Sequence, residues 1–208
     1  MIDSNTYQDQ AGPKQISHGI DLGGFDPDLV AYYEAEGWKA YYARDWLRTF
    51  GLMVRLIQAQ FHIPFPRSLL AAFHVVRATI AFAPPDHELD AVRRHLEQFY
   101  RLAAGPNNGA FDPQQVAELE LRYWVVHREL AGKPDKRQFI ATMAGLHAAI
   151  FGSTPAAMWP SALSRVEAAN AVDQITSGRS TDVAADWIRV EEHLRRAYRQ
   201  VKAAKSGT

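Results

Sequence analysis

Four side chains that can carry chemistry lie within one short stretch, LELRYWVVHREL at residues 119–130. Glu120, Tyr123, Trp124 and His127 offer a carboxylate, a phenol, an indole and an imidazole. On an α-helix, where each residue advances by about 100°, Glu120 and His127 lie two turns apart at the edge of an apolar face. If that helix is buried, Glu120 needs a cationic or hydrogen-bonding partner, because an isolated buried charge is very costly.

A second stretch, PRSLLAAFHVVRATIAFA at residues 66–83, supplies candidate partners. Arg67, His74 and Arg77 fall within about 80° of one another on a predicted helix that is otherwise apolar. If the two helices face each other, they enclose a pocket for an anionic or aromatic small molecule. Six side chains would line this pocket: His74, Arg77, Glu120, Tyr123, Trp124 and His127.

These residues support two interpretations. In a small metal-independent enzyme, His127 would be the acid–base group, Glu120 would orient it, and Arg77 would hold an anionic part of the substrate. In the structural interpretation, the basic strip is a solvated helix face, and Glu120 and His127 make hydrogen bonds within a packed core. The spacing of the residues leaves both interpretations open.

Metal and cofactor chemistry is not indicated by the sequence. The chain has no cysteine, no glutamate followed by histidine three residues later, and no pair of histidines four residues apart. Helical metal sites commonly use such spacings. Glycine-rich nucleotide-binding motifs and a serine nucleophile motif are also absent. We therefore expect neither a metal nor a cofactor.

The apolar residues recur at helical spacing, and no alternating strand pattern is bounded by turn residues. This pattern predicts an all-α, single-domain bundle of about seven to eight helices over residues 25–208, preceded by a flexible acidic arm at residues 1–24. Proline, glycine and capping residues divide the domain. The predicted helices are 27–62, which Gly37 and Gly51 could divide in two, then 67–82, 87–103, 113–131, 136–151, 155–176 and 181–204.

Charge is balanced over the whole chain, with 23 basic and 23 acidic residues, but it is uneven at the ends. Residues 1–36 hold seven acids and one base, whereas residues 187–208 hold six bases and two acids. The two ends should attract each other, within one chain or between chains. No basic stretch with interleaved aromatic residues favours nucleic acid as a partner.

The beginning of the predicted domain is rich in aromatic residues. Seven lie within DLVAYYEAEGWKAYYARDWLRTF at residues 28–50. Tyrosine and tryptophan are common at protein interfaces, so this first helix predicts an association module, either a homo-oligomer or an accessory subunit that binds another protein. Ordinary core packing is the alternative. A role at a membrane surface needs more basic residues than Lys39, Arg44 and Arg48 provide here.

Neither a signal peptide nor a transmembrane segment is predicted from the sequence. Residues 1–24 lack a basic segment followed by an apolar one. The two longest apolar stretches are each interrupted by arginine before they reach the roughly 18 residues that a bilayer requires. The expected location is therefore cytoplasmic.

Overall fold

Eight α-helices and a short 3-10 helix form the protein in the computed structural model, which describes residues 19–84, 86 and 88–206. No strand occurs in these ranges, so the predicted all-α bundle is confirmed. In chain order, the elements are α1 (Pro27–Tyr42), α2 (Trp46–Phe61), α3 (Arg67–Phe82), α4 (Leu89–Ala104), η1 (Gly105–Asn107), α5 (Pro113–Leu130), α6 (Arg137–Phe151), α7 (Pro155–Thr176) and α8 (Val183–Ser206).

The long first segment at residues 27–62 is two helices. The break lies at residues 43–45, where Arg44 adopts the left-handed conformation with φ of 59°. Asp45 then begins α2 by accepting a hydrogen bond from the backbone N–H of Arg48 at 3.2 Å. Gly37 and Gly51 lie inside α1 and α2, so the capping residue, rather than glycine, divides the segment.

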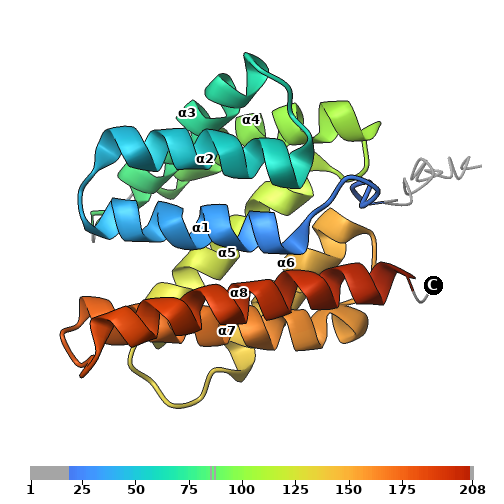
Figure 1. Ribbon diagram of the computed structural model, residues 1–208. Helices are drawn as coiled ribbons and strands as arrows, with labels where there is room; N and C mark the ends of the chain where they lie inside the picture. The colour runs from blue at the N-terminus through green and yellow to red at the C-terminus, as the bar shows by residue number, and fades with distance from the viewer. Residues whose placement is uncertain (1–18, 85, 87, 207–208) are drawn as a thin grey trace, which may run out of the picture.

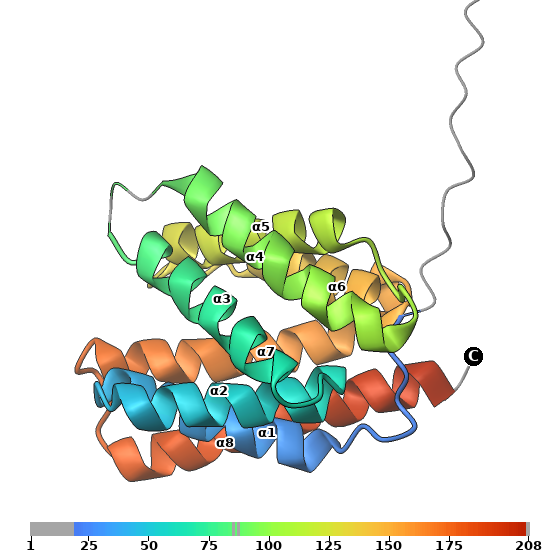
Figure 2. The same cartoon turned by 90° about the horizontal axis from the view of Figure 1, so that it is seen from above.

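The helices form a closed circuit. Each α-helix packs against the next one in sequence, and α8 returns to pack against α1 (Figures 1 and 2). Large apolar side chains, among them Phe25, Phe139 and Phe151, are fully buried in the interior. Since every element has neighbours on two sides, side chains from distant parts of the chain meet inside the circuit.

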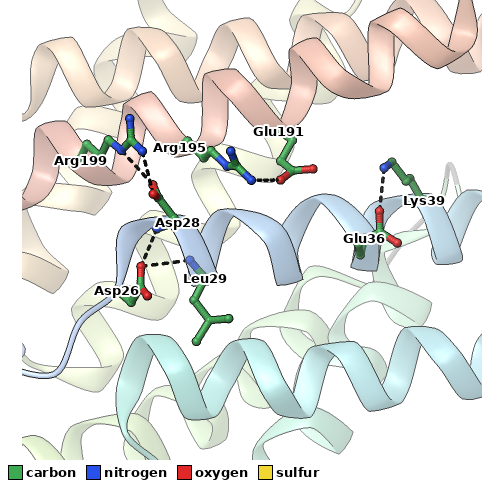
Figure 3. A network of polar contacts seen from close by, with 8 residues as sticks. All are labelled: Asp26, Asp28, Leu29, Glu36, Lys39, Glu191, Arg195 and Arg199. Atoms are coloured by element: carbon green, nitrogen blue, oxygen red, sulfur yellow. Dashed lines mark hydrogen bonds and ion pairs between the residues drawn. The ribbon is translucent and has the colours of Figure 1, made fainter.

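The attraction expected between the two ends of the chain occurs where α8 contacts α1 and closes the circuit. Arg199 of α8 donates two hydrogen bonds to the Asp28 carboxylate of α1, at 2.8 and 2.7 Å (Figure 3). The hydrogen bonds from Arg199 are the main reason that the pKa of Asp28 is lowered. Both side chains are largely exposed, so the pair orients the two helices more than it stabilises them.

Residues 19–24 correct the predicted boundary of the N-terminal arm. Ile20 is 1% exposed, and its backbone N–H donates to the carbonyl of Ile150 at 3.0 Å. The N–H of Gly19 donates to the carbonyl of Ala110 at 3.0 Å. This segment therefore packs against the bundle; the rest of the predicted arm, residues 1–18, lies outside the described residues. The sequence did not indicate this contact, because the stretch is mostly polar and backbone hydrogen bonds do not depend on side-chain composition.

Among the helices of the described residues, none has the length and apolar character needed to cross a membrane.

The contact between residue 19 and α6 generates a first prediction. Gly19 has φ of +68°, and a Cβ added there would lie 2.1 Å from the carbonyl carbon of Phe151. Gly178, with φ of +72°, has open space around the same position. Gly178→Ala should cost about 1 kcal/mol from backbone conformation alone. Gly19→Ala should cost clearly more, measured by denaturant unfolding; equal losses would show that residues 19–24 do not contribute to stability.

Candidate functional site

A buried ion pair connects α1 to α7 inside the bundle. Arg165 of α7 donates from Nη2 to Glu34 Oε1 at 2.5 Å. The hydroxyl of Tyr198 in α8 donates to Glu34 Oε2 at 2.6 Å. All three residues are buried, and one carboxylate thus joins three helices.

The Arg165 guanidinium also lies against aromatic rings. Its central carbon is 4.5 Å from the ring centroid of Trp38 and 5.9 Å from that of Tyr123. Burial alone would lower the pKa of Arg165, but Glu34 and the surrounding buried groups outweigh it, and the pKa is raised. Arg165 is therefore charged. Its Nη1 atom is buried and has no hydrogen-bond partner among the described residues.

Glu120 of α5 supplies a second carboxylate. The hydroxyl of Tyr100 in α4 donates to Oε2 at 3.1 Å, and the indole N–H of Trp124 donates to Oε1 at 2.6 Å. Burial raises the pKa of Glu120, while the bond from Trp124 and the charge of Arg165 oppose that rise. Glu120 and its two donors join the ion pair in what we term the central polar cluster: Glu34, Tyr100, Glu120, Trp124, Arg165 and Tyr198.

No residue of the central polar cluster lines either of two hollows on the described surface. One hollow lies beside the loop after α5, and the other lies at the corner between α1 and α2. The second is lined by Tyr41, Tyr42, Arg44 and Trp46. Neither includes any of the six side chains predicted to enclose a ligand. The cluster thus resembles a closed, packed core more than an open binding pocket, although Arg165 Nη1 has no hydrogen-bond partner among the described residues.

The structure does not bring the basic strip of α3 to Glu120. Arg67 and Arg77 are exposed, and α4 lies between α3 and α5 in the circuit. His74 contacts His95 of α4 instead, with the two Nδ1 atoms 3.1 Å apart. Burial lowers the pKa of both histidines, and for His95 the charges of His74 and Arg77 add to this effect. Helical rotation placed the strip on one face of α3, but only the tertiary packing shows that Arg67 and Arg77 point outward while His74 contacts α4.

His127 is paired with Asp173 of α7 rather than with Glu120. Its Nε2 atom lies 3.4 Å from Asp173, and both side chains are half-buried. The His127 ring stacks on Phe139 at 4.7 Å between centroids, with an angle of 11° between the planes. Tyr123 also stacks on Phe139, with 5.1 Å between the ring centroids and 16° between the planes. The carboxylate expected to orient His127 is therefore contributed by a different helix.

Sequence reasoning missed Glu34, Arg165, Asp173 and Tyr198. Arg165 did carry a signal, because it is the one basic residue within residues 155–176, a segment rich in alanine and serine. A single cation on such a helix needs a partner if the helix is buried. No pattern in the sequence indicates that the partner is Glu34, since 131 positions separate the two residues.

Comparisons with protein-family models, curated proteins and solved structures find no match. The functional argument therefore depends on the residues of this chain.

The outer side of α3 reverses the usual distribution of side chains. The buried residues of this helix are small: Ser68, Ala71, Ala72 and Ala78. Four of its large apolar residues are between 37% and 57% exposed, and helical rotation places them within about 100° of one another, whereas Val75 and Phe82 are partly buried against the core. Phe65, in the turn before α3, is 69% exposed. We term these residues the α3 apolar face: Phe65, Leu69, Leu70, Phe73 and Ile80.

From the central polar cluster we predict that Arg165→Met strongly lowers the free energy of unfolding. This change leaves Glu34 buried without its cation, which typically costs about 3–5 kcal/mol. Adding Glu34→Gln should restore part of the loss, because the second change removes the stranded charge. Arg77→Met is the control and should change the free energy of unfolding by no more than about 0.5 kcal/mol, as expected for an exposed arginine. Denaturant unfolding of these proteins and of the Glu34→Gln single variant measures this. A small effect of Arg165→Met, or a double variant whose loss equals the sum of the two single losses, would contradict it.

From the environment of His147 we predict that the protein loses stability in acid. It is buried, contacts the Ser161 hydroxyl at 2.9 Å, and burial, together with the charge of Arg165, lowers its pKa to about 3. In the unfolded chain, histidine takes up its proton near pH ~6.5. The contribution of neutral His147 to the free energy of unfolding should therefore be complete above this pH and should decrease as the pH falls toward 3. At pH ~4 the decrease should be about 3 kcal/mol.

Unfolding of wild-type protein and His147→Gln at pH 7 and pH 4 tests this linkage. The variant should lose about 3 kcal/mol less than the wild type between the two values, whatever its stability at pH 7. Identical losses would show that His147 is protonated in the folded protein.

Proposed function

We propose that this protein is an association module that works by binding another macromolecular surface through the α3 apolar face. The observation that carries the proposal is the reversed pattern of α3, which buries alanine and serine and exposes leucine, phenylalanine and isoleucine. Isolated exposed apolar residues are normal, but a contiguous group on one helix face is typical of an interaction site. A helix with no external partner would gain stability from the opposite arrangement.

The packing of α3 supports the same proposal. Its main neighbours are α4 and α2, and a side-chain hydrogen bond from Gln58 to Ser68 holds it against α2 at 3.1 Å. Small residues on the inner side let α3 approach these helices closely. The outer side is then available to a partner without any rearrangement of the bundle.

The aromatic beginning of the domain supports association less strongly than α3 does. Trp38 lies over Arg165 in the interior, and Tyr33, Tyr41 and Phe50 are half-buried. Three aromatic residues of α1 and α2 remain exposed: Tyr32, Tyr42 and Trp46. Much of the aromatic surface of this region therefore packs in the core, and the docking surface lies on α3 rather than on the first helix.

Photo-crosslinking in the cells that make the protein tests this function. Benzoylphenylalanine in place of Phe73 should give a covalent adduct with a protein or a lipid, because this ring lies at the middle of the α3 apolar face. The matched control places the same group at Leu163 of α7, which is 41% exposed against 48% for Phe73. An adduct at residue 73 that is at least several-fold stronger than at residue 163 supports the proposal. Equal labelling, or no adduct at residue 73, overturns it.

A further inference from the structure

The helical hairpin that carries the α3 apolar face contains no acidic residue. From Trp46 to Ala83, across α2 and α3, the chain has four arginines and no aspartate or glutamate. Arg55, Arg67 and Arg77 are exposed, and none of them forms an ion pair with another described residue. In the second half of the chain, arginines such as Arg137, Arg195 and Arg199 are paired with carboxylates. Arg48, at the start of α2, is paired with Glu36 of α1 at 2.5 Å. The rest of the α2–α3 hairpin therefore combines exposed apolar side chains with three cations that lack anionic partners among the described residues.

Helical rotation shows how the two kinds of side chain are combined on α3. Arg77 lies between Phe73 and Leu70 on the outer side, and Arg67 lies at the margin, about 60° beyond Leu70. Arg94 of α4, also exposed, adds its charge near His95, where it lowers the pKa of that histidine. Long arginine side chains can keep their charged ends at a polar boundary while their stems cover apolar surface. The pattern is that of an amphipathic helix with arginine among and beside its apolar residues.

These charges exclude a second copy of the same face as the partner. In a two-fold dimer, the same patch contacts itself. Two α3 faces would bring Arg67 and Arg77 of one copy close to those of the other, with no carboxylate on either hairpin to compensate. The surface that covers the α3 apolar face must instead be anionic.

We propose that this partner is an anionic lipid bilayer, and that α3 lies along its surface. The inference rests on the proposed association function and names its partner. A helix of a partner protein is usually received in a hydrophobic groove, whereas the α3 apolar face is the exposed side of a single helix and the turn before it. A bilayer needs no groove: it accepts a protruding helix that inserts its apolar side chains at the level of the headgroups and places basic side chains against lipid phosphates.

The position of Phe65 agrees with this geometry. This residue is the most exposed member of the α3 apolar face and lies just before the first turn of α3. The face therefore extends from residue 65 to residue 80, a length of roughly 20 Å along a helix. Inserted apolar side chains at both ends would hold the helix parallel to the membrane surface.

Sedimentation of the purified full chain with lipid vesicles tests the inference. One set of vesicles contains only phosphatidylcholine, and the other contains about 30% phosphatidylglycerol, which provides the negative surface charge that attracts basic residues. We expect partition into anionic vesicles at least tenfold stronger than into neutral ones, and weaker binding at high salt because the attraction is screened. Absence of binding to anionic vesicles, or equal binding to both kinds, overturns the inference.

Two variants and their matched controls locate the contact. Phe73→Ser should weaken partition about tenfold by removing one inserted ring, and Arg77→Gln should weaken it about fivefold on anionic vesicles by removing one charge. Leu163→Ser and Arg122→Gln, at exposed positions of α7 and α5, should leave partition within about twofold. Equal effects of the α3 variants and their controls would overturn the assignment to α3. Thermal unfolding of each variant confirms that it remains folded.

The vesicle and crosslinking experiments separate the two proposals. If vesicles do not bind but benzoylphenylalanine at residue 73 captures a protein, the association function stands and the partner is an acidic protein surface, which overturns the lipid inference. If residue 73 captures neither protein nor lipid and vesicles do not bind, both proposals fail.

Discussion

The pairing of buried Arg165 with Glu34 is the interaction on which the arrangement of the other helices depends. A guanidinium in the interior must find a carboxylate, because removal from water is costly for an unpaired charge. Glu34 meets that need only if α1 lies against the C-terminal helices, as the closed circuit places it. The Tyr198 hydroxyl donates a hydrogen bond to the second oxygen of Glu34, so the same carboxylate also constrains the position of α8.

The second carboxylate shows how the two halves of the circuit are coupled. Glu120 belongs to α5, yet the charge of Arg165 in α7 acts on it, and Tyr100 of α4 donates to it. One guanidinium near two carboxylates leaves an excess of negative charge if both are ionised. The raised pKa of Glu120 is consistent with this imbalance and with its burial. Buried polar groups specify a unique arrangement in some proteins, and the position of these groups at the junction of five helices fits that role.

The closed circuit also explains why α3 differs from its neighbours. The interior is occupied by the central polar cluster and by rings such as Tyr123 and Phe139, and α3 contributes mainly small residues to its contacts with α2 and α4. Four of its large apolar side chains therefore lie outside, in a hairpin whose exposed Arg55, Arg67 and Arg77 have no ion-pair partner among the described residues. The stability of the bundle and the proposed binding surface thus use different residues, so the surface can be altered without disturbing the core.

The all-α class, most helix ends and the need of Glu120 for a partner follow from the sequence alone, because helical periodicity, proline and capping residues act over a few positions. Asp112 and Thr154, for instance, begin helices where the local pattern predicts them. The partners themselves were decided by the tertiary structure: Asp173 for His127, Tyr100 and Trp124 for Glu120, and Glu34 for Arg165. The outward direction of Arg77 was decided in the same way. Periodicity shows which residues share a face of one helix, but the direction of that face depends on how all the helices pack, and that packing is set by contacts between residues far apart in the chain.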